Sequence, residues 1–389
     1  MKKILMVFGT RPEAIKMAPL VREIRRYPGD IDLKLCVTAQ HRDMLDQVLD
    51  LFSIQPDYDL DVMSHGQSLP DLVANMLAKL NVVLSVEKPD CVMIHGDTAT
   101  ALTAALAAFL SQIPIAHVEA GLRTHDVHSP WPEEFSRTVA GIAAELHFAP
   151  TQSAARNLEI HQGKQREIYV TGNTGIDSLL YVSQMLLPQA STTARLKAKY
   201  SFVEKFSRFI LVTNHRRENF GSRMEGIFTA ISDLAEQHPD VGFVFPVHKN
   251  PKVRDAVRDA LLNLPNIHLI DPVEYVDFVY LMSKCYLIIT DSGGIQEEAP
   301  SLGKPVILTR DTSERPEAIE AGTVRMVGYD GDALKKSVNS LLLSEVLYQE
   351  MSCIKNPYGN GTAALRIVDV LRQTNFAELL KRRMVGRGR

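Results

Sequence analysis

Short apolar runs alternate with longer amphipathic stretches along nearly the whole chain, and this alternation constrains the fold more than any other feature of the sequence. Apolar runs of about four to eight residues are typical of strands covered on both faces of a parallel sheet. Amphipathic stretches between them are typical of crossover helices. The pattern therefore predicts an α/β protein made of doubly wound parallel sheets.

This alternation of strand-like and helix-like stretches occurs twice along the chain, which predicts two successive domains. In the first half the strand-like runs are Ile4–Phe8, Leu33–Thr38, Cys91–His95, Ile113–Val118, Leu146–Ala149 and Glu167–Thr171, with helical patterns at Ala14–Arg26, Arg42–Phe52, Leu69–Val86 and Ala99–Leu110. The second half restarts with Phe209–Thr213, Gly242–Val247, Ile267–Ile270, Leu287–Thr290, Pro305–Leu308 and Thr323–Val327. We place the boundary between Gly172 and Arg208 and divide the chain into residues 1–175 and 176–360. Ligands of such sheets bind beyond the carboxyl ends of the strands, so we expect the site in an inter-domain cleft.

Composition excludes several classes of protein. With 389 residues, 45% hydrophobic and 23% charged, the chain is neither disordered nor fibrous. Its 43 basic and 46 acidic residues leave a net charge of -3, which does not favour nucleic-acid binding. The cysteines Cys36, Cys91, Cys285 and Cys353 form no CxxC pair, and no His/Asp/Glu set has a metal-site spacing. We therefore expect reduced thiols, a cytoplasmic protein and no bound metal.

No segment is predicted to enter a membrane. The apolar run after Met1-Lys2-Lys3 is interrupted by Gly9 and Arg11, too early for a signal peptide. The longest stretch of small apolar residues, Thr98–Val118, contains Ser111, Gln112 and Pro114. These residues predict a buried helix followed by a strand.

Two turns carry the features of phosphate-binding sites. After the first strand, Gly9 permits a tight turn, Pro12 can begin a helix, and the cations Arg11 and Lys16 lie where an anion would approach. An ordinary surface turn is the alternative. Neither GxGxxG nor GxxxxGK[ST] occurs as a strand-to-helix fingerprint, which argues against a dinucleotide dehydrogenase and a P-loop enzyme.

The second of these turns follows the strand Leu287–Thr290. Here Ser292, Gly293 and Gly294 can offer backbone N–H groups to a diphosphate, and Glu298 lies one turn further along to accept ribose hydroxyls. Downstream, Arg315 supplies another cation. The alternative is that the glycines only cap a packed helix.

Carboxylates follow strands of the first half, at Asp97, Glu119 and Glu133 with Glu134. Such groups face the crevice rather than the core, and different surroundings can separate acid from base roles. Helix N-capping is the alternative, mainly for Asp97. In the second half, His215-Arg216-Arg217 suits a phosphate or a departing phosphate.

Taken together and in this order, the motifs resemble those of the non-hydrolysing UDP-N-acetylglucosamine (UDP-GlcNAc) 2-epimerases. The resemblance runs from about Lys3 to Asn356-Pro357-Tyr358-Gly359 and the helix after it, and rests on Phe8-Gly9-Thr10-Arg11-Pro12-Glu13, His95-Gly96-Asp97, Glu119-Ala120-Gly121-Leu122-Arg123, Pro132-Glu133-Glu134, His215-Arg216-Arg217-Glu218 and Asp291-Ser292-Gly293-Gly294. It implies a glycosyltransferase-B-like fold in which the last helix, within 361–389, returns to the first domain, and a cytoplasmic homodimer.

The resemblance also implies a reaction and its residues. Such epimerases interconvert UDP-GlcNAc and UDP-N-acetylmannosamine (UDP-ManNAc) by eliminating UDP and adding it back, which requires no cofactor, and in bacteria they supply ManNAc for surface polysaccharide. The implied catalytic residues are Asp97, Glu119, Glu133 and His215, the last also on the UDP side. The implied substrate-binding residues are Arg11, Lys16, Arg137, Phe278, Ser292, Gly293, Gly294, Glu298 and Arg315, with Phe278 near the uracil.

Some positions depart from the family's pattern. Gln40, His41, Gln67 and His248 match a pocket where UDP-GlcNAc activates bacterial members, but Gly66 stands where an Arg is usual. The lost Arg would remove a bidentate phosphate contact, so activation is an open question. His125 replaces a usual Gly, Ser136 a usual Asn and Asn214 a usual Gly.

Other functions remain open at this point. A 2-epimerase of a modified sugar, such as a UDP-linked 2,3-diacetamido uronate or 6-deoxy sugar, differs only in the sugar pocket. A UDP-sugar glycosyltransferase can use the same phosphate-side residues but needs an acceptor. A hydrolysing relative would release free ManNAc, and a non-catalytic nucleotide-sugar-binding protein would bind without turnover.

Overall fold

The computed structural model describes residues 1–39, 42–64, 66–161, 167–214, 222–247, 257, 261 and 264–385. The chain forms two compact units. The first consists of Met1–Ser178 together with Tyr358–Arg389, and the second of Leu179–Pro357.

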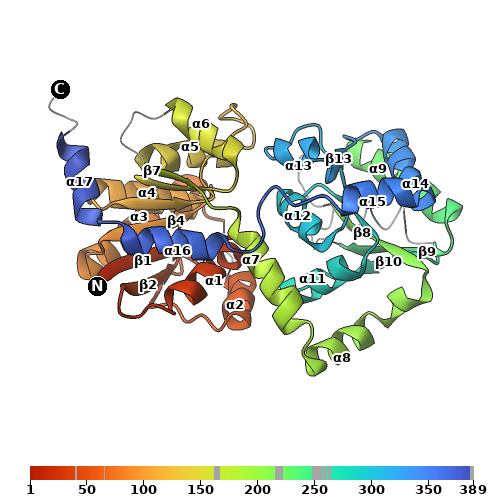
Figure 1. Ribbon diagram of the computed structural model, residues 1–389, viewed down its shortest axis with the longest axis horizontal. Coiled ribbons are helices and arrows are strands. Elements are labelled where there is room, and N and C mark those ends of the chain that lie inside the picture. Colours follow the sequence, from red (N-terminus) through yellow and green to blue (C-terminus); the bar gives the residue numbers. More distant parts are fainter. Residues whose placement is uncertain are drawn as a thin grey trace. The chain divides into compact units, whose positions relative to one another are not determined.

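The first unit contains a parallel sheet with the order β3-β2-β1-β4-β5-β6-β7 (Figure 1). Its strands are β1 (Lys2–Phe8), β2 (Ile31–Val37), β3 (Tyr58–Asp59), β4 (Cys91–His95), β5 (Ile115–Val118), β6 (Leu146–Ala149) and β7 (Glu167–Val170). Every residue of β4, β5 and β6 is buried, because helices cover both faces of the sheet. The chain reverses direction across the sheet between β1 and β4, the switch point where ligands of such folds bind.

Helices of the first unit connect these strands. They are α1 (Arg11–Ile24), α2 (Arg42–Leu51), α3 (Leu69–Glu87), α4 (Ala99–Leu110), α5 (Glu133–Ala143), α6 (Gln152–His161), α7 (Thr174–Tyr181), α16 (Ala363–Gln373) and α17 (Phe376–Val385). α1 begins in a capping box formed by Thr10 and Glu13, with a proline in its first turn as predicted. Alanines let α4 pack closely against α3 and α5, in one apolar core with β1 and β4.

The second unit repeats the architecture with six parallel strands in the order β10-β9-β8-β11-β12-β13. They are β8 (Arg208–Thr213), β9 (Val241–Pro246), β10 (Ile267–Ile270), β11 (Leu287–Thr290), β12 (Val306–Leu308) and β13 (Val324–Met326). Its helices are η1 (Val182–Leu186), α8 (Ala190–Lys199), η2 (Ser201–Lys205), α9 (Ser222–Gln237), α11 (Tyr275–Lys284), α12 (Gly293–Glu298), η4 (Ala299–Leu302), α13 (Pro316–Glu320), α14 (Gly331–Leu343) and α15 (Glu345–Ser352). Here the switch point lies between β8 and β11.

The predicted fold class is confirmed, and each predicted strand lies within two residues of an observed one. Thr98–Val118 divides into α4 and β5 as expected. In the first half of the chain, the two-residue β3 and the helices α5, α6 and α7 were missed. β3 is too short to show a period, and α6 is largely polar.

The chain returns to the first unit at Tyr358, whose side chain is fully buried. α16 then packs on α1. Its first turn is capped by Asp177, whose carboxylate accepts from the backbone N–H groups of Ala363 and Ala364 at 3.2 and 2.9 Å. Sequence positions nearly two hundred residues apart therefore form one structural unit.

Among the described residues, α3 is long and apolar enough to cross a membrane by length and composition alone. Its mean hydropathy is 1.4, and 28% of the 18-residue window is buried. Core helices of α/β domains pass the same test, and Leu72, Met76, Leu80 and Leu84 of α3 lie in the core with α4. The absence of a transmembrane segment stays a prediction.

Candidate active site

The turn between β1 and α1 is held by a buried carboxylate. Glu13 accepts hydrogen bonds from the backbone N–H groups of Gly9 and Thr10 at 3.0 and 2.8 Å, and from the Thr98 hydroxyl at 2.7 Å. Burial raises the pKa of Glu13, although these hydrogen bonds oppose the rise. Because Thr98 directly follows Asp97, Glu13 ties the turn bearing Arg11 to the turn bearing Asp97.

Gly9 is required for a reason other than the predicted tight turn. A Cβ at this position would lie 1.8 Å from the Thr38 Oγ1 and 2.6 Å from the Thr100 Oγ1. These two hydroxyls are hydrogen-bonded to each other at 2.9 Å beneath the turn. Close packing, rather than a left-handed backbone, therefore excludes any side chain here.

Glu119 lies directly after β5 in an uncommon backbone conformation, with φ of +60°. Its side chain is 8% exposed, and its Oε2 forms an ion pair with the Lys16 ammonium of α1. Asn173 donates from Nδ2 to the same oxygen at 2.8 Å. A strained non-glycine residue of this kind is common at functional sites.

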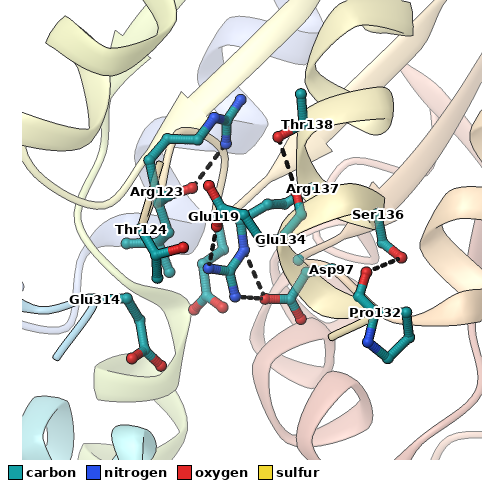
Figure 2. A network of polar contacts seen from close by, with 12 residues as sticks. Asp97, Glu119, Arg123, Thr124, Pro132, Glu134, Ser136, Arg137, Thr138 and Glu314 are labelled. Atoms are coloured by element: carbon teal, nitrogen blue, oxygen red, sulfur yellow. Dashed lines mark hydrogen bonds and ion pairs between the residues drawn. The ribbon is translucent and has the colours of Figure 1, made fainter. Parts of the chain in front are cut away.

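Asp97 and Arg137 form the next part of the site (Figure 2). Arg137 donates from Nε to Asp97 Oδ2 at 3.0 Å and from Nη2 to the same oxygen, while its Nη1 donates to Glu134 Oε2 at 2.9 Å. Glu134 is 1% exposed and Arg137 5%. The guanidinium therefore bridges two carboxylates and turns Asp97 toward α5. The N-capping alternative for Asp97 is wrong, since Thr98 caps α4 by accepting from Ala101 N–H at 3.1 Å.

Glu133 is the first residue of α5, and its Oε2 is buried without a hydrogen-bond partner among the described residues. Ser136, where the family usually has Asn, donates back to the Pro132 carbonyl at 3.0 Å. His125 adopts φ of +65°, which explains why a glycine suits that position, and its backbone N–H donates to Glu134 at 3.2 Å. Glu133 thus has a carboxylate oxygen available inside the loop cluster.

Two histidines at this edge of the sheet are held neutral. Burial lowers the pKa of His95 and of His117 to about 4. His117 donates from Nε2 to the Gly96 carbonyl at 2.7 Å, so its ring holds the turn that follows β4. His95 Nε2 lies 3.8 Å from Glu119 Oε2, and neither of its ring nitrogens has a hydrogen-bond partner among the described residues.

In the second unit, Ser292, Gly293 and Gly294 occupy the junction of β11 and α12 as predicted. A Cβ on Gly293 would lie 2.5 Å from the Arg315 Nη1, so the glycine allows the guanidinium to approach the backbone. Arg315 is buried, donates from Nε to Glu297 Oε1 at 2.6 Å and pairs with Glu314. Two carboxylates therefore fix its orientation.

Further predicted residues of this unit lie on neighbouring elements. Phe278, on α11, is half-buried, and Tyr275 of the same helix lies with its hydroxyl 3.5 Å from Glu298 Oε1. Asn214, where the family usually has glycine, is 4% exposed and accepts from the Thr309 hydroxyl at 3.3 Å. The Asn214 side chain is therefore held by Thr309, the residue that directly follows β12.

Several predictions concern residues outside the described part of the chain, namely His215, Gln40, His41 and His248. The remaining residue of the expected effector pocket, Gln67, accepts from the backbone N–H of Ser64 with its Oε1 at 3.0 Å. Gly66 beside it has φ of +73°. The effector pocket stays a prediction.

Sequence reasoning assigned no role to three residues that organise the site, namely Glu13, His95 and Asn173. Asn173 carried a usable signal, because Gly172-Asn173-Thr174 follows β7 at the same sheet edge as Asp97 and Glu119. The pairing of Glu134 with Arg137 has helical spacing of three residues. Among the described residues, no group of three or more His, Cys, Asp or Glu side chains is arranged to hold a metal ion.

Known proteins resemble this chain in both sequence and fold. The family model described as UDP-N-acetylglucosamine 2-epimerase matches residues 22–372. The UDP-N-acetylglucosamine 2-epimerase of Escherichia coli K12 is 52% identical over 375 residues, covering 96% of this chain and all of that protein.

Solved structures agree with this match. The crystal structure of UDP-GlcNAc 2-epimerase from Neisseria meningitidis bound to UDP-GlcNAc has a TM-score of 0.92 at 48% identity, over 96% of this chain and 100% of that one. The Methanocaldococcus jannaschii enzyme in complex with UDP-GlcNAc and UDP has a TM-score of 0.83 at 33% identity, over the same shares of the two chains. The folds of these neighbours are glycosyltransferase-B-like. The chain therefore belongs to the UDP-N-acetylglucosamine 2-epimerase family of isomerases.

Proposed function

We propose that this protein interconverts UDP-GlcNAc and UDP-ManNAc by elimination and re-addition of UDP. The observation that carries the proposal is the set of carboxylates Asp97 and Glu119 at adjacent strand ends, each held by a cation, in a chain of this family. UDP-GlcNAc and UDP are also the molecules bound in the related crystal structures.

The reaction has two balanced steps. In the first, a carboxylate takes the C2 proton, the C2–H electrons form the C1=C2 bond, and the C1–O bond breaks with its electron pair leaving on UDP. In the second, C2 of 2-acetamidoglucal takes a proton on its other face while a UDP oxygen bonds again to C1. No carbonyl acidifies C2, so cations must stabilise the departing diphosphate in the transition state.

Inversion at C2 favours two carboxylates on opposite faces, and we assign these proton transfers to Glu119 and Glu133. Asp97 is assigned to orienting the substrate, because Arg137 already engages its Oδ2 through two nitrogens. Glu133 suits proton transfer, since its buried Oε2 has no hydrogen-bond partner among the described residues. Which carboxylate acts as base depends on the direction of the reaction.

The UDP contacts are assigned by motif. In the first unit they are Arg11 and Lys16, and in the second they are His215, Phe278, Ser292, Gly293, Gly294, Glu298 and Arg315. The chemistry requires no redox cofactor. We also propose a cytoplasmic homodimer that supplies ManNAc for bacterial surface polysaccharide. Support for the dimer comes from α3, α4 and α5, which expose Val82, Val86, Leu110 and Ile142 on neighbouring helices.

The deciding experiment is proton NMR of UDP-GlcNAc with the purified protein in D₂O, without metal, cofactor or acceptor. We expect UDP-ManNAc to form with deuterium at C2. An unchanged spectrum with demonstrable UDP binding would instead favour the modified-sugar epimerase or the glycosyltransferase, which a panel of UDP-sugars and acceptors separates. Free ManNAc would indicate hydrolysis.

Two variants test the assigned roles. Glu119→Gln should abolish C2 exchange and leave UDP binding largely intact. Arg11→Ala should weaken UDP binding itself, by about 2–5 kcal/mol if the charge pair is buried with its ligand. Undiminished exchange would remove Glu119 from proton transfer, and unchanged UDP affinity would remove Arg11 from the phosphate site.

A further inference from the structure

We propose that Asn173 is the positioning residue for Glu119, and that the returning segment at Tyr358 fixes Asn173 in place. This inference rests on the proposed function, in which Glu119 transfers the C2 proton. Asn173 directs the carboxylate through a hydrogen bond and does not itself touch the reacting atoms.

Every hydrogen-bonding group of Asn173 has a described partner, and its backbone carbonyl accepts from the Ile176 N–H at 3.1 Å. Nδ2 donates to Glu119 Oε2, Oδ1 accepts from the Gly175 N–H, and the backbone N–H donates to the Tyr358 carbonyl, each at 2.8 Å. The residue is 3% exposed. Because Oδ1 faces an N–H, the amide has one satisfactory orientation, with Nδ2 toward the carboxylate.

Lys16 and Asn173 act differently on the same oxygen. The Lys16 ammonium supplies charge, but it lies at the end of a flexible four-carbon chain with rotatable donors. The Asn173 amide is planar and its Oδ1 is held by the Gly175 N–H, so it also fixes the orientation of the Glu119 carboxylate. A carboxylate that removes a carbon-bound proton depends on direction, since a misplacement of about 1 Å can cost about 10²-fold in rate.

The returning segment at Tyr358 and Gly359 packs against the backbone of Gly172 and Asn173. Gly172 has φ of +91°, and a Cβ there would lie 3.1 Å from the Tyr358 carbonyl oxygen. Gly359 has φ of +120°, and a Cβ at this position would lie 3.4 Å from the Gly172 Cα. Two glycines therefore allow two backbone turns to touch, and the contact places Asn173 where the chain re-enters the first unit.

Asn173→Asp is the sharpest test, because it keeps the shape and the acceptor for Gly175 but replaces the donor by a second carboxylate oxygen near Glu119. Two carboxylates at such a distance do not both ionise readily. Among the described residues, Lys16 from α1 and His95 from β4 face Glu119, and Asp97 acts electrostatically on His95. Lys16 offsets only part of the repulsion.

We expect Asn173→Asp to lower kcat about 10²-fold, to leave KM for UDP-GlcNAc within about threefold, and to move the acidic limb of the kcat profile to higher pH. Asn173→Ala should lower kcat similarly without moving that limb, because it adds no charge. Asn75→Asp is the matched control, since the Asn75 amide donates to the Val62 carbonyl at 3.1 Å, away from Glu119. It should retain wild-type kcat and pH profile.

Thermal unfolding of each variant shows whether it is folded. Glu119→Gln distinguishes a failure of the positioning role of Asn173 from a failure of the proposed proton transfer by Glu119. If Glu119→Gln loses C2 exchange while Asn173→Asp keeps wild-type kcat and pH profile, the positioning role is overturned and the proposed function stands. If Glu119→Gln retains exchange, the proposed proton transfer fails instead. Should Asn173→Asp not fold, a wild-type kcat in Asn173→Ala would overturn the positioning role.

Discussion

Arg137 donates to one oxygen of Asp97 through both its Nε and its Nη2, although the two residues lie 40 positions apart in the sequence. The third nitrogen, Nη1, is used by Glu134 in the same helix. The guanidinium thus links the end of β4 to the start of α5, and it sets the orientation of a proposed site carboxylate.

Replacing Arg137 should damage both stability and activity. Arg137→Ala leaves Glu134, which is 1% exposed, without its cation. Breaking such a buried pair typically costs about 3–5 kcal/mol of unfolding free energy. Arg137→Lys should recover part of the stability but not kcat, because an ammonium cannot reproduce the two-carboxylate bridge. Urea unfolding and initial rates measure both, with the exposed Arg26→Ala as a control that changes neither.

Gly293→Ala should weaken UDP binding by about tenfold or more, an effect equal to about 1.4 kcal/mol. The added methyl would meet the Arg315 guanidinium at 2.5 Å, and Glu297 and Glu314 restrict its retreat. Titration calorimetry with UDP measures the loss. Gly226→Ala in α9 is the control, since the nearest atom to its added Cβ would be the Tyr329 carbonyl oxygen at 3.8 Å, and it should bind UDP normally.

The second unit should lose stability in acid through Asp277. The pKa of this fully buried carboxylate lies below the ordinary 3.8. Burial alone would raise it, but hydrogen bonds from Lys199, Arg195 and Tyr200 outweigh the effect of burial. Its contribution is therefore present above about pH 4 and is lost as pH falls through the lowered pKa. Asp277→Asn should be less stable than wild type at pH 7 and should lose less on acidification. Equal stabilities of the two proteins at pH 7 would contradict this, with the exposed Asp233→Asn as control.

Asp177, in the first unit, should have the opposite effect on the pH dependence of stability, because its contribution is lost as pH rises. Burial raises its pKa to about 6 from 3.8, despite hydrogen bonds from the first turn of α16. Its contribution to stability is greatest below about pH 4 and is lost as pH rises through 6, by up to about 3 kcal/mol. Asp177→Asn removes this dependence, so the difference in unfolding free energy between mutant and wild type should change between pH 4 and pH 7. A constant difference would show that Asp177 titrates normally.

A charged residue on the exposed apolar face of α3 and α4 should prevent the proposed dimer. Leu110 is 64% exposed at the end of α4, and Leu110→Glu would place an ion in a desolvated interface. Sedimentation velocity at micromolar concentration should then report a monomer. Leu343→Glu, at a position 78% exposed on α14, is the control and should sediment as wild type. A dimer in both variants would exclude this face.

The sequence alone determined the fold class, nearly all strands and the family. Buried parallel strands need unbroken apolar runs, and these are local patterns that a linear reading detects. It also indicated that Asp97, Glu119 and Glu133 follow strands or open a helix, since polar residues at those points are equally local signals.

Only the tertiary structure decided which groups meet. Lys16 pairs with Glu119 across 103 positions and Asn173 reaches the same carboxylate across 54. These contacts depend on the strand order β1-β4-β5-β6-β7 and on the return of the chain at Tyr358. Periodicity specifies that a segment is a strand but not which strand lies beside it, because that choice depends on the packing of the whole sheet. Sequence reasoning therefore identified the proposed catalytic carboxylates but not the contacts that hold them.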